Sequence, residues 1–224
     1  MALDRRPPAS GHSYHAILEM PKKAKPQWLN QPHHPHSECA HPPIANGMPS
    51  TSKGELIRIQ DCEPIHMAAF RDLNLAWIRR YFRIEPKDRL LLDAPQQQIL
   101  DIGGTILVAV TTPKPTGNDH VLGTCALIPE AGGSVLELCK MCVDERFLGQ
   151  GIGGLLGRAA IHRAKHLGAL SLRLETNSQL TPAIRLYEKL GFTHSAARKS
   201  PYARADVQMS IDFPPQTGVP TTTT

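Results

Sequence analysis

The sequence contains no long apolar run. Its longest strongly apolar stretch, Ile106 to Val110, has the length of one strand, whereas a membrane-spanning helix needs roughly 18 or more apolar residues. Prolines follow Arg5 and Arg6, at the point where a secretory signal peptide requires its apolar segment. We therefore expect no membrane-spanning helix and no secretion, while an organelle transit peptide stays compatible with this N-terminus.

Cysteine is scarce, with five residues in a chain of 224. An odd number of cysteines in a chain without a signal peptide favours reduced thiols over a framework of disulfides. Together with the lack of apolar segments, this predicts a cytoplasmic protein.

A concentrated basic surface is also lacking. The chain carries 25 Lys and Arg against 20 Asp and Glu, and residues 1–53 account for six of the basic and three of the acidic side chains. The remainder holds 19 basic and 17 acidic residues, a net charge of +2. Because nucleic-acid binding needs basic residues gathered on one face, we expect no nucleic-acid partner.

Residues 1–53 have the composition of a disordered tail, with nine of the 20 prolines, six of the 11 histidines and almost no apolar periodicity. One cluster in this tail has metal-ligating side chains, but prolines interleave it, and we favour a solvated low-complexity segment without a metal. Its members are His33, His34, His36, Cys39 and His41. We predict one folded domain at 54–213 and a second loose tail at 214–224.

Apolar periodicity predicts alternating strands and helices across the folded region. Expected strands cover 55–60, 105–110, 120–128, 134–143, 170–176, 192–196 and 205–211, and expected helices cover 65–82, 85–92, 151–167 and 181–190. Thr181 is the expected N-cap of the last helix, with Pro182 at its first position. Gly168 and Gly191 are expected to end their helices.

A glycine-rich loop lies between the expected strand ending at Val143 and the helix that follows. Residues 149–154 read Gly-Gln-Gly-Ile-Gly-Gly, and glycines there let backbone amides approach an anion beside the positive end of a helix dipole. The run also spells the dinucleotide fingerprint G-x-G-x-x-G, with Glu175 ending the next strand. Only about 50 structured residues and one helix follow, too few for a dinucleotide-binding domain. No Lys-Ser or Lys-Thr follows, as a nucleoside-triphosphate loop would require.

Four segments, in this order, make the chain resemble the GNAT superfamily of acetyltransferases over most of 55–213. They are 137–143 (Glu-Leu-Cys-Lys-Met-Cys-Val), the loop 149–154, 174–177 (Leu-Glu-Thr-Asn) and 183–192 (Ala-Ile-Arg-Leu-Tyr-Glu-Lys-Leu-Gly-Phe). The resemblance implies an α/β (α+β) fold with one domain. Its sheet would be mixed and mostly antiparallel, flanked by helices, and splayed between the strand ending at Val143 and the strand ending at Asn177.

The resemblance also implies acetyl-CoA as cosubstrate and no metal. The pantothenate arm of CoA would lie in the splayed gap and bond backbone groups of Met141, Cys142 and Val143. Asn177 would bond the pantetheine amide, although a simple turn role fits it nearly as well. The pyrophosphate would rest on the loop amides of Gly149, Gln150, Gly151, Ile152, Gly153 and Gly154.

Glu137 and Tyr187 are the candidate catalytic residues. An amine must lose a proton before it attacks a thioester, and Glu137 lies in an otherwise apolar strand, where burial would raise its pKa. The alternative for Glu137 is a structural ion pair. The resemblance makes Tyr187 the proton donor to the CoA sulfur, while its helical face, shared with Ala183 and Leu190, also fits core packing.

Two further residue pairs have less specific patterns. Cys139 and Cys142 spell C-x-x-C, but residues three apart in a strand point to opposite faces, so we expect no shared metal or disulfide. Arg204 and Asp206 are expected either to pair with each other or to bind substrate.

Substrate recognition is expected from the helices at 65–92 and from the region of Pro201 and Tyr202. Three aromatic residues there could equally belong to the core: Trp77, Tyr81 and Phe82.

The predicted function is acetylation of a primary amine, in a small molecule or amino-acid-like metabolite, because no docking module for a protein substrate accompanies the domain. The alternative is a catalytically silent acyl-CoA-binding sensor or interaction protein of the same fold. In both cases we expect a monomer or homodimer with neither nucleic acid nor membrane as partner. A nicotinamide oxidoreductase would bind NAD instead.

Overall fold

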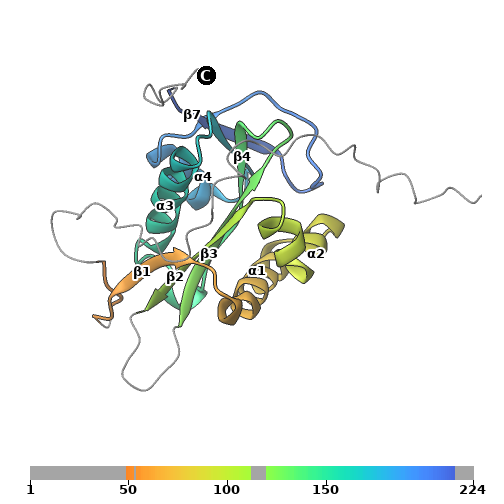
Figure 1. Ribbon diagram of the computed structural model, residues 1–224. Helices are drawn as coiled ribbons and strands as arrows, with labels where there is room; N and C mark the ends of the chain where they lie inside the picture. The colour runs from red at the N-terminus through yellow and green to blue at the C-terminus, as the bar shows by residue number, and fades with distance from the viewer. Residues whose placement is uncertain (1–48, 53, 112–119, 215–224) are drawn as a thin grey trace, which may run out of the picture. The chain divides into compact units, whose positions relative to one another are not determined.

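The computed structural model describes residues 49–52, 54–111 and 120–214 (Figure 1). The predicted N-terminal tail up to residue 48, with its histidine-rich cluster, and the predicted C-terminal tail from residue 215 lie outside the described residues. No helix in the part that is described is long and apolar enough to cross a bilayer.

A seven-stranded sheet forms the centre of the described domain, in the order β1-β2-β3-β4-β5-β7-β6. Neighbouring strands are antiparallel except for β4 and β5, which are parallel. The strands are β1 (Ile57–Asp61), β2 (Thr105–Thr111), β3 (Val121–Pro129), β4 (Val135–Val143), β5 (Ser171–Thr176), β6 (Thr193–His194) and β7 (Val207–Asp212). The expected mixed, mostly antiparallel sheet is confirmed, and each expected strand is present within a few residues of its predicted bounds.

Four α-helices and several shorter turns accompany the sheet in the described residues. The helices are α1 (Met67–Tyr81), α2 (Pro86–Asp93), α3 (Ile152–His166) and α4 (Thr181–Lys189), and the turns are η2 (Pro64–His66), η3 (Gln96–Leu100) and η4 (Glu145–Phe147). The π-helical turn η3, which buries Ile99, is absent from the sequence prediction.

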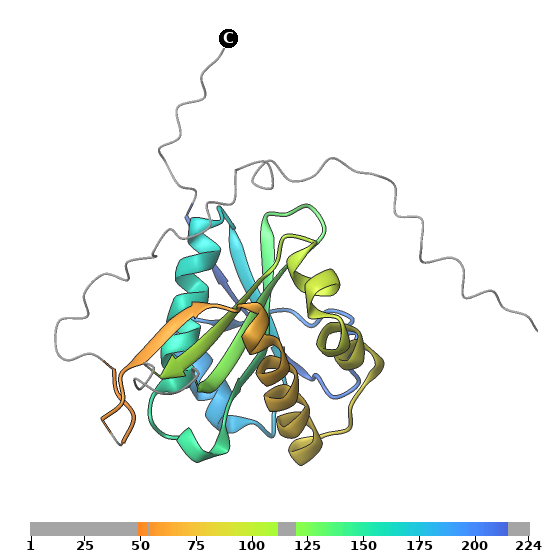
Figure 2. The same ribbon diagram turned by 60° about the horizontal axis from the view of Figure 1, so that its bottom comes forward.

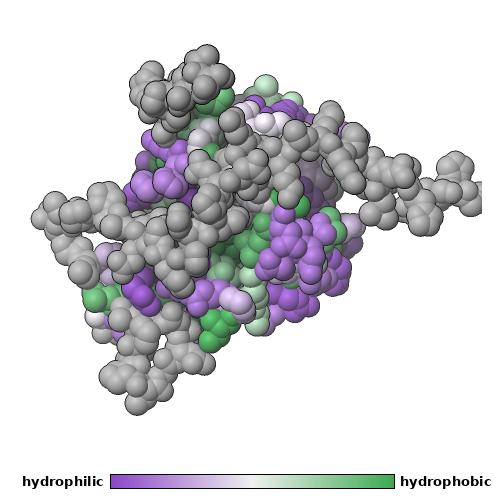
Figure 3. Space-filling view, viewed as in Figure 1, coloured by the Kyte–Doolittle hydropathy of each residue, from purple (hydrophilic) through white to green (hydrophobic). Residues whose placement is uncertain are grey.

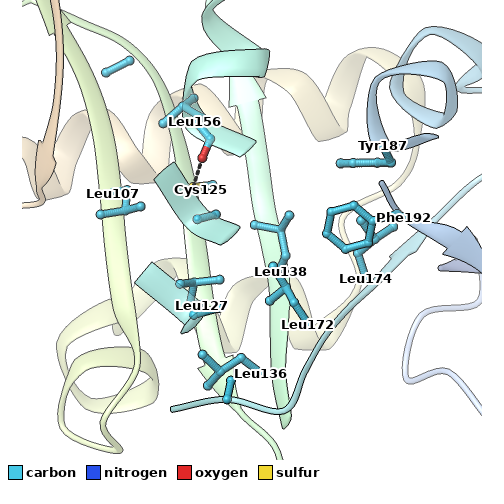
Figure 4. Close-up of a cluster of buried hydrophobic side chains, with 14 of the residues drawn as sticks. Leu107, Cys125, Leu127, Leu136, Leu138, Leu156, Leu172, Leu174, Tyr187 and Phe192 are labelled. Carbon is cyan, nitrogen blue, oxygen red and sulfur yellow. Dashed lines mark hydrogen bonds between the residues drawn. The ribbon is translucent and has the colours of Figure 1, made fainter. Parts of the chain in front are cut away.

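The helices cover the two faces of the sheet, with α3 and α4 on one side and α1 and α2 on the other (Figures 1 and 2). Leu156 of α3 and Tyr187 of α4 pack with Leu136, Leu138 and further strand residues in one core (Figure 4). Phe70 of α1 and Leu92 of α2 pack with Ile106, Ala126 and Ile128 in a second core. In the view of Figure 3 the outer surface over α2 is largely hydrophilic, which fits a helix that buries one face only.

The start of α4 differs from the prediction. Leu180 occupies the N-cap without a side-chain hydrogen bond, Thr181 is the first helical residue and Pro182 follows it. Because the proline has no amide hydrogen to satisfy, it is accommodated within the first turn at either position. The glycines expected to end helices both have positive φ, 74° at Gly168 and 95° at Gly191.

A turn before β1 joins the domain earlier in the sequence than the expected boundary at residue 54. Thr51 is buried and accepts a hydrogen bond from the Glu55 amide through its side chain. Ser50 and Leu56 form an isolated antiparallel bridge. Residues 49–52 therefore contribute contacts to the folded part of the chain.

Candidate functional site

The sheet opens between β4 and β5. The two strands pair from Val135 with Ser171 to Leu138 with Leu174, and no pair follows, although both strands continue. A cavity of about 210 Å³ lies along this opening, and its lining includes Met141, Cys142 and Val143. The expected splay is therefore present, and it begins at Leu138 on β4.

A β-bulge displaces β4 where the sheet opens. Its register against β3 shifts between Thr124 and Ala126, and Lys140 has φ of 50°, the single positive value at a non-glycine residue in the described part of the chain. The bulge inserts one residue into the alternation of side chains. As a result, the side chains of β4 that follow Lys140 point to the opposite face of the sheet from the one that strict alternation would predict.

The bulge overturns the prediction that Cys139 and Cys142 point to opposite faces. Cys139 packs against the core of α1 and α2. Cys142 lies 3.4 Å from the Thr124 hydroxyl, which accepts a hydrogen bond from Asn74 of α1. Both cysteines therefore lie on the α1 side of the sheet, where they are free thiols whose pKa burial raises.

A buried ion cluster surrounds the Lys140 side chain. Its ammonium donates to Asp88 Oδ1 at 2.7 Å and to the Tyr202 hydroxyl at 3.0 Å. Arg204 donates to both oxygens of Asp88 at 2.7 Å and to Glu85 at 2.9 Å. Burial alone would raise the pKa of Asp88, but the bonds from Arg204 and Lys140 outweigh it and lower that pKa. The cluster joins α2, the bulge of β4 and the segment before β7.

Arg204 and Asp206 do not pair with each other. Asp206 instead accepts hydrogen bonds from the Ser178 amide and hydroxyl, both at 2.7 Å. Arg204 belongs to the buried cluster and also lines the cavity. Asp206 therefore contacts the turn after β5, whereas Arg204 contacts the start of α2.

The glycine loop presents backbone amides to solvent at the start of α3. Gly149 and Gly151 have φ of 77° and 78°, and a Cβ built on either would meet no atom within 4 Å. The first helical bond runs from the Leu155 amide to the Gly151 carbonyl, and among the described residues no acceptor receives the amides of 149–154. The loop is thus an open cradle of donors at a helix N-terminus, which suits an anion.

The remaining positions of the loop have more specific surroundings. A Cβ at Gly153 would lie 3.1 Å from Leu186 of α4, and one at Gly154 would lie 3.3 Å from the Arg158 guanidinium. The side chain of Gln150 accepts a hydrogen bond from the Ser52 amide at 2.9 Å. The loop is therefore held against α4 on one side and against the turn before β1 on the other.

Glu137 lies where two cavities meet. It lines the cavity of the splayed gap and a second cavity of about 170 Å³, and Glu175 of β5 lines both as well. The Glu137 side chain is 17% exposed, with Lys87 Nζ at 3.9 Å. Burial raises the pKa of Glu137, the nearby Lys87 opposes this effect, and the charge of Glu175 adds to it.

Tyr187 is both a core residue and a lining residue of the splayed gap. Its ring packs edge-on against Phe192 at 5.9 Å between centroids (Figure 4), and it also lines the larger cavity. No hydrogen-bond partner of its hydroxyl occurs among the described residues. Burial raises the pKa of that hydroxyl, so it keeps its proton at neutral pH. The two readings of Tyr187 drawn from the sequence are therefore compatible.

Asn177 stabilises the turn after β5. Its amide group donates to the Arg204 carbonyl at 2.6 Å, and its oxygen accepts from the Gln179 amide at 2.9 Å. This is the turn role that the sequence left open. The residue also lines the larger cavity.

Comparison with known proteins assigns the family. Residues 69–192, more than half of the chain, match the model of the acetyltransferase (GNAT) family. The chain belongs to the GNAT family.

Solved GNAT structures share the fold at low sequence identity. An acetyltransferase of the GNAT family from Staphylococcus aureus has a TM-score of 0.60 and 19% identity, over 70% of this chain and 98% of that one. A Salmonella typhimurium protein, whose structure contains its cofactor acetyl-CoA, has a TM-score of 0.54 and 20% identity, over 74% and 98%.

Among curated proteins, N-acetylaspartate synthetase of Rattus norvegicus is 36% identical to this GNAT chain over 78 residues, which are 35% of this chain and 26% of that protein. The human protein of the same name matches equally. The chain thus spans about a quarter of the length of these relatives.

Sequence reasoning missed three charged residues that lie in or beside the candidate site of this GNAT chain. Glu175 was noted only as the end of a strand, yet it lies at the junction of the two cavities. Lys87 lies in α2, far from Glu137 in the sequence, and no sequence pattern predicts that the two residues are neighbours. Arg158 could have been found, because it follows Gly154 by four residues, the spacing that brings side chains together on a helix.

Proposed function

We propose that this protein transfers the acetyl group of acetyl-CoA to a primary amine. The observation that carries the proposal is the meeting of two cavities at Glu137 and Glu175. One cavity follows the splayed gap toward the glycine loop, and the other opens beside α2 and the segment before β7. Two reactants entering from different sides would meet at these carboxylates.

The residues of the first cavity fit acetyl-CoA, which supplies an activated acetyl thioester when bound. The open amides of 149–154 would hold the pyrophosphate, and the absence of any atom near a Cβ at Gly149 or Gly151 leaves room for it. Backbone groups of Met141, Cys142 and Val143 have no partner strand on the β5 side and would pair with the pantetheine arm. Asn177 keeps a second amide hydrogen for that arm.

Glu137 would take the proton from the acceptor amine, directly or through a water molecule. Its buried position raises its pKa, and a carboxylate with a pKa nearer neutrality is a better base for this task. The amine nitrogen then bonds to the thioester carbon, the carbon–sulfur bond breaks, and the nitrogen releases its second proton to water.

Tyr187 would give a proton to the departing sulfur. Tyr187 lines the same cavity, and its hydroxyl retains its proton because burial raises its pKa and has no competing acceptor among the described residues. Solvent would restore the proton to Tyr187 and remove the one held by Glu137. The net products are the amide, free CoA and one proton.

The acceptor that we propose is a small, amino-acid-like amine. A cavity of about 170 Å³ is small compared with the roughly 300 to 1,000 Å³ of sites for drug-sized ligands. The name of the relatives, N-acetylaspartate synthetase, supports an amino-acid-like acceptor.

Release of free CoA thiol from acetyl-CoA tests the proposal. We expect release that depends on an added amine, measured over a panel of amino acids and simple amines. Binding of acetyl-CoA without release, whichever amine is added, would favour a silent acyl-CoA-binding protein instead. Thermal stabilisation by NAD and not by acetyl-CoA would contradict both.

A further inference from the structure

Glu175 of β5 is held by uncharged donors among the described residues. Its carboxylate accepts hydrogen bonds from the Ser200 hydroxyl at 2.5 Å and from the Gln208 amide at 3.1 Å, both of which are uncharged donors. No ion pair of Glu175 occurs in the described part of the chain. A partly buried carboxylate held in this way attracts a positively charged group.

The other end of the smaller cavity is cationic. Arg173 and Arg198 share one carboxylate, that of Glu130, at 3.3 Å and 3.2 Å, so one positive charge is left over. Lys199 lines the same cavity and has no ion-pair partner among the described residues. Together these side chains form a basic rim of the cavity, made of Glu130, Arg173, Arg198 and Lys199.

The two ends are separated along β5. Arg173 and Glu175 lie two residues apart on the same face of the strand, which corresponds to about 7 Å. Lys87 lies near Glu137 at 3.9 Å. The smaller cavity is therefore negative at its junction with the splayed gap and positive at its outer end.

We infer that the acceptor is an amine that also carries a carboxylate. Its ammonium group is held by Glu175 beside Glu137, and its carboxylate is held by Arg198 and Lys199 of the basic rim. This inference rests on the proposed function, because that function makes the bound amine an acetyl acceptor. The charges from which the inference is drawn are those of the side chains that line the smaller cavity.

Calorimetry on the protein loaded with CoA tests the inference without turnover, because CoA carries no acetyl group. The probes are two matched pairs, L-alanine against L-alaninamide and β-alanine against its amide, in which the single carboxylate is replaced by a neutral group of similar size. A hydrogen bond to a charged group contributes about 1.5–3 kcal/mol. We therefore expect each acid to bind about ten- to a hundredfold more tightly than its amide.

Variants locate the discrimination. Arg198→Gln and Lys199→Gln remove exposed charges of the basic rim, and Arg173 still pairs with Glu130 in the first. Each should reduce the preference for the acid by about tenfold or more. Arg89→Gln removes an exposed charge of α2 outside both cavities and should leave the preference unchanged. Glu175→Gln should weaken binding of every amine probe.

The outcomes separate this inference from the proposed function. Equal binding of acid and amide, no binding of either acid, or full discrimination in both rim variants would overturn the inference, even if other amines release thiol from acetyl-CoA. A preference for the acid that is lost in the rim variants would support the inference about the acceptor. Failure of every amine to release thiol from acetyl-CoA would contradict the proposed transfer, but it would leave this inference standing.

Discussion

The ammonium group of Lys140 lies 2.7 Å from Asp88, and the Lys140 backbone adopts the left-handed conformation that the bulge imposes. Asp88 is fully buried and Lys140 nearly so, with 5% of its side chain exposed. A non-glycine residue in this conformation costs on the order of 1 kcal/mol or more. The ion cluster ties this residue of β4 to α2 and to Arg204 where the sheet opens.

Replacing Asp88 should strongly destabilise the protein. In Asp88→Asn the buried charges of Lys140 and Arg204 lose their shared carboxylate, and removal of one partner of a buried ion pair costs about 3–5 kcal/mol. Denaturant unfolding at neutral pH measures the loss. Asp72→Asn, an exposed substitution on α1, is the control and should change stability by less than about 1 kcal/mol.

The same pair predicts the behaviour of the protein in acid. The pKa of Asp88 is lower in the folded protein than in the unfolded chain, where it is about 3.9. The unfolded chain therefore binds the proton more readily, so the contribution of Asp88 is complete above about pH 4 and is lost as the pH falls through the folded pKa. The free energies of unfolding of the parent protein and of Asp88→Asn, measured as a function of pH, should converge in this acidic range. A difference that stays constant down to pH 2 would contradict the assignment.

Glu137→Gln should lower kcat by a factor of about 10² to 10⁴, because the amide cannot take a proton. Acetyl-CoA affinity should hold. In the parent enzyme the active carboxylate form is lost as the pH falls through the raised pKa of Glu137, whereas the variant should gain rate as the pH rises and deprotonates the amine. Glu188→Gln on α4 is the control, being half exposed. A near-normal kcat of Glu137→Gln at neutral pH would remove Glu137 from the mechanism.

Tyr187→Phe should separate catalysis from packing. The hydroxyl has no partner among the described residues, so its removal deletes no hydrogen bond within them and should leave the melting temperature nearly unchanged. Loss of a proton donor to the sulfur should lower kcat by about tenfold or more. A lower melting temperature at full kcat would instead identify Tyr187 as a core residue only.

Gly151→Val should abolish acetyl-CoA binding. The substitution forces a β-branched residue into positive φ and places its side chain in the open space of the loop. Gly168→Val is a matched control, since Gly168 has φ of 74° and equally open surroundings at the other end of α3. Calorimetry on both folded variants should show loss of binding in Gly151→Val alone. Similar affinities in the two would reject the loop as the phosphate site.

Much of the fold follows from local patterns in the sequence. Alternating residues such as Leu172 and Leu174 predict a strand, and Gly168 predicts the end of a helix, because these signals act over a few residues. Family resemblance, not periodicity, predicted the opening between β4 and β5. The glycine loop was found because its four glycines lie within six consecutive residues of the chain.

The rest depends on long-range or irregular contacts. The bulge at Lys140 is marked by no glycine or proline in β4, so the faces of Cys139 and Cys142 were assigned wrongly. Asp88 meets Lys140 across 52 positions and Arg204 across 116, and nothing local relates these residues. Glu175 resembles any charged residue at a strand end until Ser200 is placed beside it.

The opening of the sheet has a consequence for stability. Within the sheet, β4 and β5 are joined by four residue pairs, and beyond Leu138 each strand keeps an unpaired edge. A linear molecule that bonds to these edges would serve as an additional strand, and whatever free energy it gains there is added to that of the fold. The free energy that holds the N-terminal strands to the C-terminal strands would then depend in part on that molecule, and the stability of the protein would vary with its concentration in the cell.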